Sequence, residues 1–114
     1  MADIRRQADS LSIPDVGTAV TLCLPITEHN KGLLTRVTTC IAGAITSGDS
    51  KVVISKNATV LGTIVVANTS SAAGDIDYLD LTGTELSVGD FIKVANGGES
   101  TGTAPMVVVF DIVR

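Results

Sequence analysis

The stretch GAITSGDSKVVISKNATVLGTIVV, residues 43–66, shows the pattern that decides the fold. Short runs rich in Val, Ile and Thr are broken at near-regular intervals by Gly, Asp, Ser and Asn, and this alternation continues to Arg114. Ser47-Gly48-Asp49 separates two apolar runs and favours a tight hairpin, because Gly and Asp tolerate positive φ. No 3.6-residue periodicity is sustained for ten residues. The chain is therefore predicted to be all-β, a single antiparallel β-sandwich of the jelly-roll kind.

The length of 114 residues allows one domain. A chain of this size buries about two-thirds of the surface that its unfolded form exposes, which is enough for one two-layer core. Hydrophobic residues make up 45% of the chain but aromatic residues only 3%. We therefore expect a core of Val, Ile and Leu, in a sandwich that spans residues 17–114.

Residues 1–16 differ in composition from the rest of the chain. They hold three acids and two arginines, with few large apolar side chains. Such a segment is too polar for a core strand and has too little apolar surface to fold alone. We predict an extended N-terminal arm, either frayed or ordered on a neighbouring chain. Its expected contact residues are Ile4, Arg5, Arg6, Leu11 and Ile13.

The run from Ala104 to Val113 is apolar on both faces of the expected strand. One parity holds Met106, Val108, Phe110 and Ile112, and the other holds Val107, Val109 and Val113. A strand of an isolated sandwich alternates apolar with polar residues, so a second apolar face needs cover. The run 60–66 repeats this more weakly, and a homo-oligomer with closed symmetry is expected. Its predicted interface residues are Val107, Val109, Val113, Leu61 and Val65.

The charge of the chain is unevenly distributed. The net charge of -4 disfavours a nucleic-acid partner, because phosphate neutralisation needs clustered Lys and Arg. Residues 58–114 carry seven acids against two bases, whereas residues 1–57 carry six bases against five acids. One end or face is therefore predicted to be acidic and to prefer a basic partner.

Residues suited to catalysis are scarce. The single histidine, His29, lies in a polar loop and is expected to be a solvated side chain rather than a base. Asp75, Asp77 and Asp80 read as a solvated acidic edge, with a weak cation site as the alternative, because the glycine and distal glutamate of a calcium loop are missing. No phosphate-cradling glycine motif is present. We predict no enzymatic activity, no metal and no cofactor.

The two cysteines, Cys23 and Cys40, are expected on the outer faces of their strands. No secretory signal or bilayer-spanning apolar run is recognisable, so we expect synthesis and folding in a cytoplasm, where thiols stay reduced. Two cysteines alone do not exclude a bridge. No membrane partner is predicted.

Several segments resemble the small structural proteins of tailed bacteriophages. They are GAITSGD (43–49), GTIVV (62–66), SAAGDID (71–77), VGDFIKV (88–94) and STGTA (100–104). The order of turns and strands is similar to that of small β-sandwich head proteins that decorate or cement the capsid. The resemblance implies oligomers, with three copies as the expected number, on the outer surface of the virion. It also implies the major capsid protein as partner, and it carries no catalytic residue.

A second class of function stays open beside the capsid role. Tail, fibre or baseplate modules and receptor-contacting adhesins also use small oligomeric β-sandwiches, and fold does not fix function. The aromatic complement is only Tyr78, Phe91 and Phe110. Because sugar readers recruit more stacking side chains, this composition disfavours a glycan-binding tip.

Overall fold

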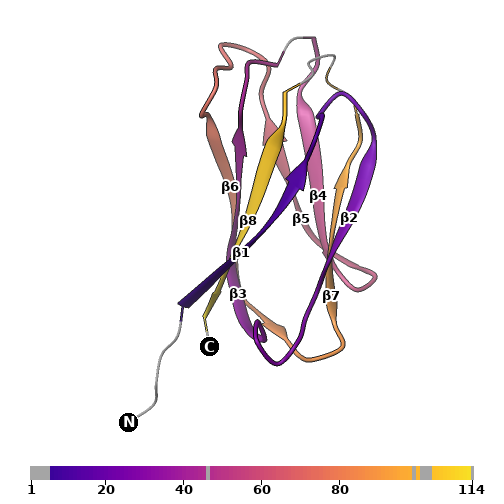
Figure 1. The fold of residues 1–114 in the computed structure, drawn as a ribbon, viewed down its shortest axis with the longest axis vertical. Helices are drawn as coiled ribbons and strands as arrows, with labels where there is room; N and C mark the ends of the chain where they lie inside the picture. Colours follow the sequence, from indigo (N-terminus) through magenta and orange to yellow (C-terminus); the bar gives the residue numbers. More distant parts are fainter. Residues whose placement is uncertain (1–5, 46, 99, 101–103, 114) are drawn as a thin grey trace.

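The computed structural model describes residues 6–45, 47–98, 100 and 104–113 of the chain. These residues form eight strands and two facing sheets (Figure 1). The strands are β1 (Arg6–Ile13), β2 (Val20–Pro25), β3 (Gly32–Ile41), β4 (Ser50–Lys56), β5 (Thr59–Val66), β6 (Ile76–Leu86), β7 (Phe91–Asn96) and β8 (Met106–Val113).

The strand order is that of a jelly roll. Sheet A has the order β1-β8-β3-β6 and sheet B the order β2-β7-β4-β5. All pairings are antiparallel, and β1 pairs with β8, β2 with β7, β3 with β6, and β4 with β5. The chain thus runs as one long hairpin wrapped around a common core, and every connection except the β4–β5 hairpin passes between the sheets. The predicted all-β sandwich is confirmed.

The core between the sheets is aliphatic, as predicted from the composition. On β8, Met106, Val108, Phe110 and Ile112 are all buried, and Phe110 is the largest fully buried side chain. Branched side chains from both sheets pack against them, including Val37 of β3 and Ile54 of β4. Each such residue contributes about 1.5–3 kcal/mol by leaving water.

Residues 6–16 lie within the sandwich rather than in a separate arm. β1 pairs with β8 along its whole length, from Arg6 opposite Val113 to Ile13 opposite Met106. Ile13 and Val16 are fully buried, and Leu11 packs against the core. From its composition this segment was expected to be too polar for a strand. It lies at the edge of a sheet, where only the alternate residues that face the core need to be apolar. Of the predicted arm contacts, Ile4 and Arg5 lie outside the described residues.

A buried asparagine ties the β1–β2 connection to sheet B. Asn96 is 3% exposed. Its Nδ2 donates hydrogen bonds to the carbonyls of Val16 (3.1 Å) and Thr18 (3.0 Å). The Ser50 hydroxyl donates to its Oδ1 at 3.2 Å. This network fixes the place where the chain crosses from sheet A to sheet B.

Candidate functional site

The outer face of sheet A is crossed by three rows of side chains, each with one residue from β1, β8, β3 and β6. The rows are Ser12, Val107, Cys40 and Ile76; Ser10, Val109, Thr38 and Tyr78; and Ala8, Asp111, Arg36 and Asp80. Directly opposed residues of an antiparallel pair lie on the same face of the sheet, so each row is continuous in space. These twelve residues are called the A face below.

The first two rows form an exposed apolar patch. Ile76 is 65% exposed, Tyr78 56% and Val107 40%, while Val109 is half-buried. The outward parity of Val107 and Val109 agrees with the predicted two-sided strand. Val113 lies on the same side and is half-buried, opposite Leu33, which is 44% exposed. The half-buried Thr38 and Cys40 of β3 lie between Val107 and Val109 on one side and Ile76 and Tyr78 on the other. Exposed apolar side chains gathered on one face of a sheet mark interaction surfaces.

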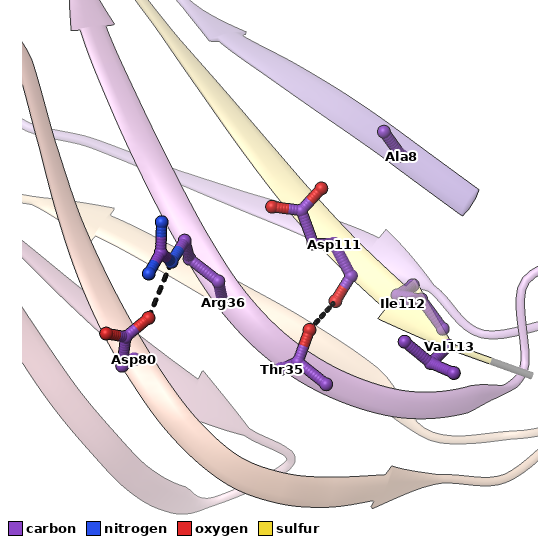
Figure 2. A pocket seen from close by; sticks show the side chains of 7 residues that line it. All are labelled: Ala8, Thr35, Arg36, Asp80, Asp111, Ile112 and Val113. Atoms are coloured by element: carbon purple, nitrogen blue, oxygen red, sulfur yellow. Dashed lines mark hydrogen bonds and ion pairs between the residues drawn. The ribbon is translucent and has the colours of Figure 1, made fainter. Parts of the chain in front are cut away.

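The third row is charged and borders the apolar patch. The Arg36 Nε donates to the Asp80 carboxylate at 2.5 Å, as Figure 2 shows. The guanidinium carbon also lies 4.3 Å from the centre of the Tyr78 ring. The hydrogen bond to Asp80 raises the pKa of Arg36 above its ordinary value, while desolvation lowers it. Arg36 therefore links the acidic row to the apolar rows.

A β-bulge creates a hollow beside this charged row. The β3 register shifts between Leu34 and Arg36, and the extra residue, Thr35, donates its hydroxyl to the Asp111 carbonyl at 3.3 Å. The hollow has a volume of about 510 Å³. Figure 2 shows its lining of Ala8, Thr35, Arg36, Asp80, Asp111, Ile112 and Val113. Two carboxylates against one guanidinium make this hollow suited to a cationic side chain.

The structure separates the predicted interface residues into two groups. Val107, Val109 and Val113 lie on sheet A, but Leu61 and Val65 belong to β5 of sheet B. Leu61 also does not share an outer surface with Val65. A register shift between Ile54 and Ser55 breaks the alternation of β5, so Leu61 packs against the core while Val65 is 47% exposed.

Sheet B has an outer face of a different character. Its rows contain Thr21, Ala95, Val53 and Thr63; Cys23, Lys93, Ser55 and Val60; and Lys51 with Val65. These ten residues are called the B face below. Val60 is 62% exposed, so this face also presents apolar surface.

The two sheets carry opposite charge. The described strands of sheet B hold three lysines and no acid, a net charge of +3. The strands of sheet A hold five acids and two arginines, a net charge of -3. An acidic face was predicted from the two halves of the chain. In sheet A, Asp9 and Asp77 share the inner parity, opposite the buried Phe110 and Thr39, so the A face itself holds Asp80 and Asp111 against Arg36, a net charge of -1. The sheets differ because the jelly-roll topology places the lysine-bearing strands β4 and β7 in sheet B and the acidic strands β6 and β8 in sheet A.

The residues considered for chemistry are not brought together. His29 is exposed in the β2–β3 connection, where its backbone N–H donates to the Thr27 hydroxyl at 3.2 Å. Asp75 accepts from the Ala72 N–H, and Asp80 pairs with Arg36. Burial raises the pKa of Asp77 above its usual value, and the charge of Asp75 adds to this. Among the described residues, no three His, Cys, Asp or Glu side chains are placed to hold a metal ion.

Both cysteines are free and lie on outer faces, as predicted. Cys23 is exposed on β2 of sheet B, and Cys40 is half-buried on β3 of sheet A. They therefore lie on opposite sides of the sandwich. No helix in the described part of the chain is long and apolar enough to cross a bilayer.

Comparisons with known proteins give a distant structural likeness. No family model matches the chain, and neither does a curated protein. Among solved structures, the chain is similar to part of dimeric latent PorU from Porphyromonas gingivalis, with 12% sequence identity and a TM-score of 0.48. The match covers 98% of this chain and 13% of that chain. A likeness at this level carries no argument about function.

Proposed function

We propose that this protein is a virion structural protein of a tailed bacteriophage that binds the outer surface of the head and cements it. The observation that carries the proposal is the exposed apolar patch of the A face. Ile76 and Tyr78 of β6 and Val107 of β8 expose large apolar side chains on the same outer face, on either side of β3. An exposed patch of this kind, bordered by charge, is suited to binding another protein.

The architecture supports a structural role. Jelly rolls recur in viral capsid proteins, because paired strands wrapped around one core form a rigid block with broad faces. A cement protein needs such a block, since modest contacts to several neighbours add up through valency. The proposed partner is the major capsid protein, reached after synthesis in the host cytoplasm. The proposed oligomer has three copies, a number that comes from the capsid analogy.

β1 offers a second contact. It is an edge strand that pairs with β8 on one side only. No strand among the described residues pairs with its other edge, and the outward side chains Ala8, Ser10 and Ser12 are small enough to let a partner approach. We therefore propose that the A face joins copies of this protein and that the β1 edge contacts the capsid.

The test uses empty heads of the phage that carries this chain, prepared without it. Wild-type protein is expected to co-sediment with the heads and to add regular density to their outer surface in cryo-electron microscopy. The A variant, Val107→Lys with Val109→Lys, is expected to lose binding. A control with the same added charge, Ala58→Lys with Ala73→Lys, changes exposed loop residues and is expected to bind.

The same experiment distinguishes the capsid role from the alternative, a tail or fibre module. Density on tails or fibres of complete particles, with bare heads, would replace the capsid role by that of a tail module. Equal head binding by the A variant and the wild type would remove the A face from the proposal.

A further inference from the structure

We infer that copies of this chain associate with each other heterologously, the A face of one copy packing on the B face of the next. The inference deepens the proposed function, on which it rests for its biological role. It names the partner of the A face as a second copy of the chain. Because the A and B faces lie on opposite sides of the sandwich, the three-copy oligomer of the proposed function requires this contact to close as a ring. Its support comes from charge, from apolar surface and from the hollow beside Asp111.

The two faces have complementary charge. The B face holds Lys51 and Lys93, within a sheet whose described strands contain no acid. The A face holds Asp80 and Asp111 against Arg36. Complementary charge steers two surfaces together and fixes how they meet.

Symmetric packing is disfavoured by the same charges. If two A faces met around a two-fold axis, the four carboxylates of Asp80 and Asp111 would share one interface with only two guanidiniums, each already paired with Asp80 of its own copy. If two B faces met, the interface would hold Lys93 of both copies and no carboxylate from the B face. Like charges facing each other in an interface are costly, so the arrangement that pairs opposite charge uses different faces of the two copies.

Both faces also supply apolar surface to bury. Ile76, Tyr78 and Val107 lie exposed on the A face, and Val60 and Val65 lie exposed on the B face. The predicted interface residues Val107, Val109 and Val65 lie on both sides of this one contact. A two-fold contact made by a single face leaves one of these groups uncovered.

The hollow gives the contact a specific feature. The Asp111 carboxylate lies on the hollow with Asp80, and it interacts electrostatically with Arg36, whose hydrogen bond goes to Asp80. Lys93 lies on the B face between Cys23 and Ser55. A lysine stem is long enough to lay its methylenes on apolar surface while its ammonium reaches a carboxylate. The Lys93 ammonium of the next copy is the group that we place in this hollow.

The test uses two blocked forms of the full chain. The A variant (Val107→Lys, Val109→Lys) places lysines where the lysine-bearing B face must dock. The B variant (Val65→Glu, Lys93→Glu) places carboxylates where the acidic A face must dock. Each variant keeps one intact face. Circular dichroism melts confirm folding, and Lys93→Glu alone replaces the B variant if the double change unfolds the protein.

Native mass spectrometry and light scattering give the outcome. Wild-type protein is expected to form species of several chains, and each variant alone is expected to remain at the mass of one chain, 11.7 kDa. An equal mixture of the two variants is expected to form a dimer of one A and one B chain that grows no further, because only one pair of faces is intact. The Ala58→Lys, Ala73→Lys control is expected to assemble like the wild type.

Three results would overturn the inference. If the B variant alone keeps the wild-type mass, the A face associates with itself. If the A variant alone keeps that mass, the B face associates with itself. If the mixture yields only single chains, the two faces do not bind each other. If wild-type protein assembles but never binds heads, the proposed function is overturned and this inference stands. If wild-type protein stays as single chains that still bind heads, this inference is overturned and the proposed function stands.

Discussion

The guanidinium carbon of Arg36 lies 4.3 Å from the centre of the Tyr78 ring, on the border between the acidic and apolar rows of the A face. Arg36 also pairs with Asp80. The only cation described on this face is thus engaged by its own sheet. As a consequence, the A face keeps a net negative charge toward a partner, and the Arg36 guanidinium covers the ring of Tyr78.

Removal of Arg36 is expected to tighten self-association. Arg36→Ala makes the A face more acidic and strengthens its attraction for the lysines of the B face, by roughly two- to five-fold at low salt, as for one exposed charge interaction. Sedimentation velocity at several concentrations measures the change. Arg36→Lys keeps the charge and serves as control, and weaker association of Arg36→Ala would contradict the charge argument.

Salt is expected to weaken association of the wild type. The proposed contact pairs exposed lysines with carboxylates, and such interactions are screened beyond about 8–10 Å at physiological salt. The dissociation constant, followed by light scattering from 0.05 to 0.5 M NaCl, is expected to rise. A constant that falls with salt would indicate a contact governed by apolar burial alone.

Loss of the buried amide of Asn96 is expected to destabilise the fold. Asn96→Ala leaves the carbonyls of Val16 and Thr18 without their donor. The cost is about 2–3 kcal/mol in the free energy of unfolding, as for buried polar groups left unsatisfied. Urea denaturation measures it, with Asn68→Ala in the β5–β6 connection as control. A change equal to that of the control would show that water replaces the amide.

Asp90 is expected to stabilise the fold at neutral pH and to lose this effect in acid. Hydrogen bonds from the Ser87 N–H and the Asn57 amide, with the charge of Lys56 nearby, hold the pKa of Asp90 below its usual value. Its contribution is present above the unfolded-state pKa of about 3.9 and is lost as the pH falls through the lower folded-state value. The deficit of Asp90→Asn in urea unfolding should therefore be largest near pH 6 and should shrink below pH 4. A constant deficit would contradict this.

The ionised carboxylate of Asp77 is expected to destabilise the fold at neutral pH, whereas that of Asp90 stabilises it. Burial and the charge of Asp75 raise its pKa, so the fold disfavours the ionised carboxylate at neutral pH. Asp77→Asn is therefore expected to stabilise the protein at pH 7, by a gain that disappears as acid protonates the wild-type carboxyl. Measured beside Asp90→Asn, it gives two pH profiles of opposite slope. Destabilisation at pH 7 would show that the carboxylate makes a favourable contact.

The sequence predicted the features that follow from period-two alternation. The buried parity of β8, the outward Val107 and Val109, and the outward cysteines all depend only on which residues share a strand face. β1 was not predicted as a strand because an edge strand needs few apolar residues. Its inward Leu11 and Ile13 are too few for an alternating pattern to be recognised in a polar segment. Removal of residues 1–13 should therefore destabilise the sandwich rather than only weaken attachment.

Other features depend on contacts between distant segments. Leu61 was predicted on the outer surface but packs against the core, because a β-bulge opposite Ser55 breaks the alternation of β5. Gly62, beside the bulge, is the residue in the sequence that could have indicated it. The hollow beside Asp111 arises from the bulge at Thr35 in another strand. The segregation of acids and lysines between sheets depends on the order in which the strands are wrapped.

The central claim, that the A face needs a protein partner and finds it in another copy, is tested most directly by sedimentation equilibrium of the wild type. The account predicts a mass of several chains at micromolar concentration, which falls to 11.7 kDa for Val107→Lys with Val109→Lys. A wild type that stays at 11.7 kDa up to the highest soluble concentration would contradict it.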